Sequence, residues 1–152
     1  MITKEAVLAF QRKWSEKIID IGNMHQDKGD FYSATTNFIS NLYAYDSEPV
    51  LFKPTLASDN PFRLTKEAAL SYFIGGNPNY SEDIGFALKN WTNIVWKNSG
   101  ISIIDKTAIC MGHYFFTNKD GELKVEFSIV LHELDDGKLK IILHDSHLPY
   151  QK

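Results

Sequence analysis

The sequence predicts an α+β fold, in which N-terminal helices pack on a strongly curved antiparallel sheet. In the first third of the chain, apolar side chains recur at steps of three and four, as they do on one face of a helix. In the last third, three apolar-rich runs are separated by the turn sequences Asn118–Gly121 and Asp135–Gly137. Asp-Gly between such runs is a strong hairpin signal. A sheet that curves strongly around helices can leave a cavity at its open end, so a pocket is expected there.

Two one-sided helices are predicted at the start of the chain. The first is expected to begin after the N-cap residue Thr3 and to end at Gly22-Asn23, because these residue types commonly follow helix C-termini. The second is expected to begin after Asp30, which can cap it in the same way. The apolar stripes are Val7, Phe10, Trp14, Ile18 and Ile21 in the first helix, and Phe31, Ala34, Phe38, Leu42 and Tyr45 in the second. Each stripe must pack on another element, and we expect that element to be the sheet.

The middle of the chain is predicted to contain short strands and one more helix. A strand over 50–53 is expected at a sheet edge, because Pro54 has no N–H to donate to a neighbouring strand. Thr65 is expected to cap a short helix that ends before the Gly- and Asn-rich segment 75–79. Extended segments are predicted over 86–98 and 101–104, leading into the three-stranded meander. Because no repeat or linker composition interrupts the chain, residues 1–152 are predicted to form one domain.

Composition and charge narrow the function classes. The chain is 43% hydrophobic and 23% charged, with a net charge of −3 and no cluster of Lys or Arg, so neither nucleic acid nor a membrane surface is an expected partner. A single cysteine, Cys110, excludes an intramolecular disulfide and suits a reducing compartment. No segment has the length of apolar sequence that a signal peptide or a membrane span needs. A cytoplasmic location is therefore expected.

Turn lengths decide which side chains of the meander share a face. If both loops contain three residues, Ser128 faces His144, Glu126 faces Ser146, and Tyr114 lies opposite Glu126. These five residues then form one polar patch. The opposite face is aliphatic, with Val125, Phe127, Ile129, Leu131, Leu139, Ile141 and Leu143. A loop of two or four residues changes the parity and removes the patch.

The chain resembles the nuclear transport factor 2-like superfamily. The resemblance rests on the two-helix start, the strand LFKPTLA, the helix ending in SYF and the terminal HDSHLP. Within the superfamily it is most similar to the association domain of calcium/calmodulin-dependent protein kinase II, which shares a Phe-x-Pro strand and a closing His-x-Ser-x-x-Pro. The matching residues here are Phe52, Pro54, His144, Ser146 and Pro149. This resemblance implies a conical α+β fold, a pocket between helices and sheet, and assembly into dimers or rings.

Ketosteroid isomerases belong to the same superfamily, but their acidic residues are not matched. Their general-base aspartate falls on Lys53, and their second, protonated acid falls near Val130. The pocket arginine of the association domains falls on Tyr114. The resemblance therefore implies the fold and does not transfer a known chemistry.

Two functions are consistent with these patterns. The leading expectation is a self-associating domain, a homodimer or larger, whose pocket binds a small hydrophobic or mixed-polarity ligand without a cofactor. The alternative is a small-molecule enzyme of the polyketide cyclase, dehydratase or isomerase type, with His144 and Glu126 as acid and base. The predicted pocket residues are Trp14, Lys53, Trp91, Tyr114, Glu126, Ser128, His144 and Ser146. No metal site is expected, because side chains three residues apart on a strand, such as His144 and His147, point to opposite faces.

Overall fold

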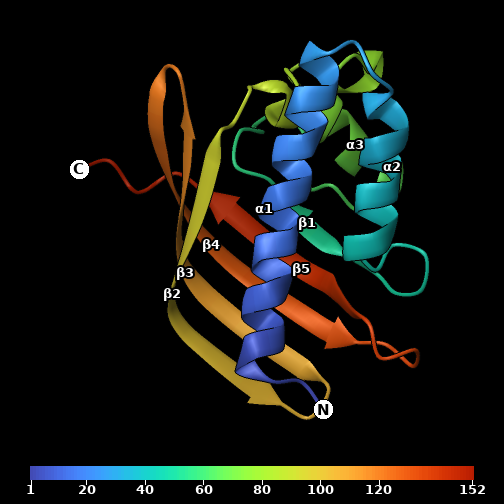
Figure 1. Ribbon diagram of the computed structural model, residues 1–152, viewed down its shortest axis with the longest axis vertical. Helices are drawn as coiled ribbons and strands as arrows, with labels where there is room; N and C mark the ends of the chain where they lie inside the picture. The colour runs from blue at the N-terminus through green and yellow to red at the C-terminus, as the bar shows by residue number, and fades with distance from the viewer.

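The protein consists of three helices packed on one face of a curved five-stranded sheet, as the computed structural model of residues 1–152 shows (Figure 1). The helices are α1 (Lys4–Gln26), α2 (Phe31–Leu42) and α3 (Lys66–Ile74). The strands are β1 (Leu51–Lys53), β2 (Asn93–Ile104), β3 (Thr107–Asn118), β4 (Gly121–Glu133) and β5 (Leu139–His147). They lie in the order β1-β5-β4-β3-β2, and only β1, which runs parallel to β5, departs from antiparallel pairing. The α+β prediction is confirmed.

The predicted capping residues start all three helices. The side chains of Thr3, Asp30 and Thr65 accept hydrogen bonds from the N–H of Ala6, Ser33 and Ala68. The predicted end of the first helix is wrong, because α1 continues through Gly22 to Gln26. Gly22 is there for packing: a Cβ at this position would lie 3.0 Å from the Ala87 carbonyl oxygen.

The segment before the meander differs from the prediction at both ends. Residues Phe86–Leu88 were expected to begin a strand, but they form a 3₁₀ turn (η2). Trp91, which follows this turn, is buried. The strand β2 starts only at Asn93, and it includes the segment 101–104 that was expected to stand apart. A bulge between Asn98 and Gly100 joins the two halves. The expected edge strand is confirmed as β1.

The register of the meander is the main correction to the sequence-based prediction. The β3–β4 turn has two residues and not three, so Tyr114 pairs with Val125 in place of Glu126. In the β4–β5 pair the predicted register holds next to the turn, where Leu131 pairs with Ile141. A β-bulge then leaves Ile142 without a partner, and Val130 pairs with Leu143. Beyond this bulge His144 and Ser146 share a face with Phe127 and Ile129, in place of the predicted Glu126 and Ser128.

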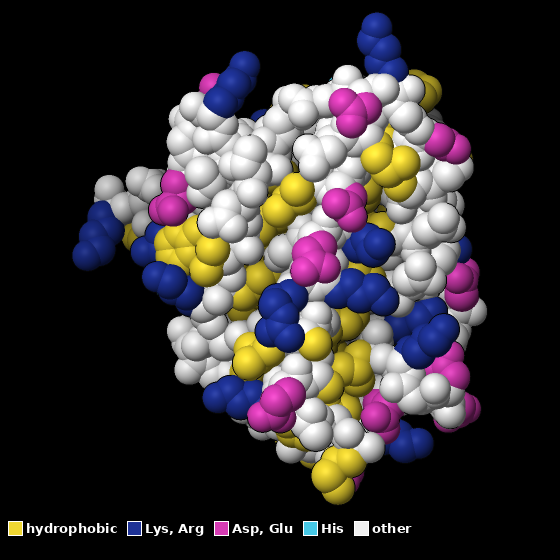
Figure 2. Space-filling model, viewed as in Figure 1, with side chains coloured by type: hydrophobic (Ala, Val, Ile, Leu, Met, Phe, Trp, Pro, Cys, Tyr) yellow, Lys and Arg dark blue, Asp and Glu magenta, His cyan; other side chains and the backbone are white.

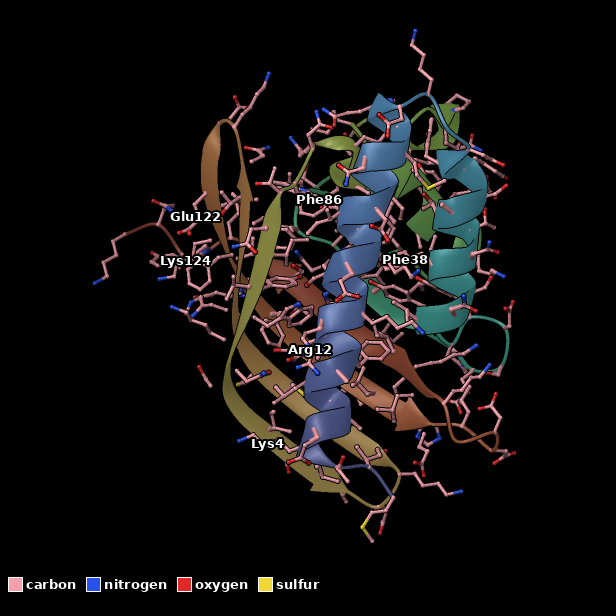
Figure 3. All side chains as sticks on the ribbon, in the orientation of Figure 1. Lys4, Arg12, Phe38, Phe86, Glu122 and Lys124 are labelled. Carbon is pink, nitrogen blue, oxygen red and sulfur yellow. The ribbon has the colours of Figure 1, made fainter.

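The two faces of the sheet are therefore composed differently from the prediction. The inner face, under the helices, combines the aliphatic and aromatic side chains of β3 and β4 with His144 and Ser146 of β5. In Figure 3, Phe38 lies between α1 and α2 and Phe86 lies behind α1, whereas Glu122 and Lys124 project from β4 away from the helices. None of the helices combines the length and the apolarity needed to cross a membrane.

Candidate active site

A small cavity lies on the inner face of the sheet, between α1, α3 and the end of β5. Its volume is about 10 Å³, close to the minimum that accommodates one water molecule. The walls are Trp14, Phe52, Pro54, Tyr72, Phe73 and Phe86, and the polar groups are Thr55, Tyr114, His144 and Ser146. Aromatic rings thus surround a group of hydroxyls and one imidazole, and no carboxylate or ammonium group lines the cavity.

The sheet and the edge strand bring these polar groups together. His144 and Ser146 point inward from alternate positions of β5, after the bulge at Ile142, and Tyr114 points inward from β3. Thr55 follows β1, which pairs in parallel with β5 from Leu51↔Leu143 to Lys53↔Asp145. Pairing with β1 therefore places Thr55 beside Ser146.

A continuous chain of hydrogen bonds runs from the core to the cavity. The Trp14 Nε1–H donates to Tyr43 Oη over 3.2 Å, and Tyr43 Oη lies 3.0 Å from His144 Nδ1. On the other side of the ring, His144 Nε2 lies 3.0 Å from Tyr114 Oη. The chain continues from Tyr114 Oη to Ser146 Oγ over 2.5 Å, and from there to Thr55 Oγ1 over 2.6 Å. Thr55 is half-buried and is the member closest to the surface.

Burial keeps every member of this chain neutral. It lowers the pKa of the His144 imidazole to about 3, because the charged form would lose its hydration without gaining an acidic partner. The same burial raises the pKa values of Tyr43 and Tyr114 far above their usual range, so both keep their hydroxyl hydrogens. At neutral pH the site is an uncharged network of hydrogen-bond donors and acceptors.

A buried ion pair holds the loop that carries Thr55. Arg63, at the other end of this loop, is fully buried and donates two hydrogen bonds of 2.7 Å to the carboxylate of Asp83. It also donates to the carbonyl oxygens of Asn60 and Ala68, over 2.7 and 2.9 Å. On the cavity side, Tyr72 Oη accepts from the N–H of Leu56, next to Thr55. The loop is thus fixed by fully paired buried groups at both ends.

The model of one protein family, described as metal-independent carbonic anhydrase, matches residues 5–148 of this chain. The chain belongs to this family. A curated metal-independent carbonic anhydrase from Nostoc sp. strain PCC 7120 is 40% identical over 99% of this chain and 76% of its own length. The structure is also similar to a crystal structure of the iota-carbonic anhydrase from a cyanobacterium complexed with bicarbonate. That similarity has a TM-score of 0.95 at 40% identity, over 99% of this chain and 94% of the other.

The predicted nuclear transport factor 2-like fold is confirmed by more distant structures, which share the fold alone. An NTF2-like protein from Shewanella oneidensis gives a TM-score of 0.62 at 13% identity, over 96% of this chain and 99% of the other. A putative calcium/calmodulin-dependent protein kinase type II association domain from Thiobacillus denitrificans gives 0.57 at 14% identity, over 98% and 96%. The predicted function is wrong, however. Membership of the carbonic anhydrase family overturns both the association domain of unknown ligand and the cyclase, dehydratase or isomerase alternative.

The structure brings together half of the residues that were predicted to line a pocket. Trp14, Tyr114, His144 and Ser146 line the cavity. Trp91 is buried behind it, where its Nε1–H donates to the carbonyl of Phe86. Lys53 points away from the cavity, and its Nζ lies 3.3 Å from the backbone oxygen of Ser146.

Two more of the predicted pocket residues, Glu126 and Ser128, also lie outside the cavity. Both lie on the outer face of the sheet, because the two-residue turn and the bulge change the parity on which their assignment depended. Glu126 there contacts His113 and His147, with N···O distances of 3.3 and 3.2 Å. No hydrogen bond or shared cavity connects it with His144.

Sequence reasoning missed Thr55, Tyr72 and Tyr43. A signal existed for Thr55, since it directly follows the Phe-x-Pro strand that supported the family resemblance. Tyr72 lies on the buried side of α3, and nothing in a helical pattern distinguishes a core residue from a cavity wall. Tyr43 lies just past the end of α2 and had no pattern at all.

Proposed function

We propose that this chain catalyses the reversible hydration of carbon dioxide to bicarbonate in the cavity beside His144. The supporting observation is an uncharged cavity of aromatic walls and clustered hydroxyls in a chain that is 40% identical, over nearly its whole length, to a bicarbonate-bound carbonic anhydrase structure. Aromatic walls suit carbon dioxide, which has no net dipole. Hydroxyl groups suit the attacking water and the oxygens of bicarbonate.

In this reaction the water oxygen forms a bond to the carbon of carbon dioxide. One C=O electron pair moves onto an oxygen, and one proton leaves the water. In this proposal Thr55 and Ser146, whose hydroxyl oxygens lie 2.6 Å apart, hold the water, and one of the two hydroxyls donates to the developing anion. His144 serves as a neutral hydrogen-bonding group, because a pKa of about 3 makes it a weak proton acceptor at neutral pH.

The cavity must widen for this chemistry. A volume of about 10 Å³ holds one water molecule at most, whereas carbon dioxide has three heavy atoms. The half-buried side at Thr55 faces solvent, so we propose that substrate enters and the proton leaves there.

Carbon dioxide hydration, followed by stopped-flow detection of proton release, tests this proposal. The wild-type protein is expected to be active, and to stay active after treatment with a strong chelator. Ser146→Ala is expected to lose about 100- to 1,000-fold in kcat, as removal of one donor to a developing anion does elsewhere. The matched control is Ser128→Ala, which removes the same hydroxyl from the outer face of the sheet. An inactive wild type, activity that requires added metal, or equal effects of the two variants would contradict the proposal.

We also propose that two copies of the chain pair through the outer face of the sheet. A row of apolar side chains crosses four strands there: Leu51 of β1, Leu143 of β5, Val130 of β4 and Ile109 of β3. Leu51 and Ile109 are 55% and 42% exposed, and the neighbouring Met111 is 55% exposed. The opposite, helix-covered side of the molecule, which Figure 2 shows, also has apolar side chains, but these lie between charged ones. A continuous apolar row across a sheet face favours pairing with a second sheet.

Light scattering after size exclusion tests the pairing. The wild type is expected to elute as a dimer that buries an interface of about 1,600 Å², and Ile109→Lys is expected to be monomeric. Ile84→Lys is the control, because Ile84 is 68% exposed and lies in a loop away from the sheet. A wild-type monomer at micromolar concentration would overturn this proposal.

A cytoplasmic location likewise remains a proposal, supported by the single cysteine.

A further inference from the structure

The tautomer of His144 follows from the hydrogen bonds around Tyr43. The Tyr43 hydroxyl is fully buried and contacts two polar groups, Trp14 Nε1 and His144 Nδ1. An indole N–H can donate and cannot accept. The Tyr43 hydrogen therefore has one acceptor available, which is Nδ1 of His144. If Nδ1 accepts, the neutral ring must carry its hydrogen on Nε2.

The remaining links then take their direction from this choice. Nε2–H of His144 donates to Tyr114 Oη, since it lies 3.0 Å away. The Tyr114 hydroxyl donates to Ser146 Oγ, and the Ser146–Thr55 pair needs only one of its two hydrogens. Within this chain of hydrogen bonds, one hydroxyl hydrogen, from Thr55 or Ser146, is left over at the cavity. In the opposite tautomer the unused hydrogen is that of Tyr43, deep in the core without an acceptor.

We propose that Tyr43 is a positioning residue that sets the Nε2–H tautomer of His144 and thereby directs a free hydroxyl hydrogen into the cavity. Tyr43 itself does not line the cavity. The cavity presents a hydrogen-bond donor, which suits an anionic oxygen such as that of bicarbonate. This inference rests on the proposed function for its ligand but not for the tautomer itself.

Nitrogen-15 NMR of the His144 ring in the intact protein tests the tautomer directly. In the wild type, Nε2 is expected to be protonated and Nδ1 to accept, with the Nε2–H form in excess by about tenfold or more, the ratio that one unpaired buried donor supports. In Tyr43→Phe, Nδ1 lacks a hydrogen-bond partner in either tautomer. The populations of the two tautomers are therefore expected to differ by less than roughly threefold. Bicarbonate binding and kcat are expected to fall with the population of the Nε2–H form.

Tyr45→Phe is the matched control. It removes a tyrosine hydroxyl from the same segment, but this hydroxyl donates to the carbonyl oxygen of Arg63 and is not part of the chain. The tautomer ratio is expected to stay unchanged in this variant, even if its stability falls. A wild-type ring with the proton on Nδ1, or an unchanged ratio in Tyr43→Phe, would overturn the inference. An Nε2–H ring in a protein without carbon dioxide hydration would leave the inference standing and overturn the proposed function.

Discussion

Two histidines on β5 show how the same side chain differs between the two faces of the sheet. His144 is buried on the inner face between two tyrosine hydroxyls, and burial lowers its pKa to about 3. His147, three residues later, is about half exposed on the outer face and contacts the carboxylates of Glu126 and Asp145. Inside, hydrogen bonds between neutral groups replace water. Outside, charged groups keep their hydration.

The difference teaches that the placement of charge, more than the residue type, separates the two faces. The titratable groups of the inner network have no oppositely charged partner, and their neutral forms are the ones that pair. In the same interior, from which water is excluded, the buried aromatic side chains and the buried Arg63–Asp83 pair contribute strongly to the free energy of unfolding. The first three of the following predictions each compare a buried group with a more exposed group of the same kind, and the fourth concerns an outer-face carboxylate alone.

The largest effect is expected from the aromatic core. Trp14 is buried and its ring lies within 6.1 Å of Phe38, Trp96, Tyr114 and Phe116. Trp14→Ala is expected to lower the free energy of unfolding by about 3–5 kcal/mol. Phe115→Ala, on the outer face, is expected to lower it by about 1 kcal/mol. Urea unfolding followed by circular dichroism measures both, and equal losses would contradict the comparison.

A second comparison concerns ion pairs. Asp83→Asn leaves Arg63 buried beside a neutral partner, and it is expected to destabilise the protein by roughly 3 kcal/mol or more. Asp46→Asn breaks the exposed pair with Lys66, which is 2.9 Å long, and is expected to change stability by less than about 1 kcal/mol. Thermal unfolding at neutral pH distinguishes them. If Asp46→Asn and Asp83→Asn lowered the stability equally, burial would not determine the strength of these ion pairs.

The pH dependence of stability is the third comparison. In the unfolded chain His144 binds a proton below about pH 6.5, whereas in the folded protein it stays neutral down to about pH 3. The unfolded state binds more protons in this window, so the unfolding free energy should fall as the pH falls, by up to about 1.4 kcal/mol per pH unit. His144→Gln should remove this slope and His147→Gln should keep it. Unfolding titrations between pH 4 and 7 measure the slope, and an unchanged slope in His144→Gln would contradict the buried neutral ring.

The smallest effect is expected from Glu126, which sequence reasoning had paired with His144 as an acid or base. Glu126→Gln leaves the cavity untouched, because Glu126 contacts His113 and His147 on the outer face. Carbon dioxide hydration is therefore expected to change by less than about twofold, a difference of under about 0.5 kcal/mol. A loss of tenfold or more would mean that the outer face takes part in the reaction.

The fold could be predicted from the sequence because its signals are local. Helix caps such as Thr3 and Asp30, and the Asp-Gly turns, depend on a few neighbouring residues. The site could be predicted only in part, because it depends on parity across long strands. Two irregularities, the two-residue turn at Lys119-Asp120 and the unpaired Ile142, together moved Glu126 and Ser128 out of the predicted site and left Tyr114, His144 and Ser146 together. No local pattern in β5 marks that position as a bulge.

The bulge at Ile142 also limits how the length of this chain can change. Removing Ile142 itself would give β4 and β5 an uninterrupted ladder and leave His144 opposite Ile129, because Ile142 is the residue without a partner. A single insertion between Leu143 and His144 would instead turn His144 and Ser146 outward and bring Asp145 into the core. Insertions are therefore compatible with the site in the 135–137 loop, where Gly137 has a positive φ of 82° and the backbone faces solvent. The pairing of His144 with Ile129 is as much a requirement of the site as the residues themselves.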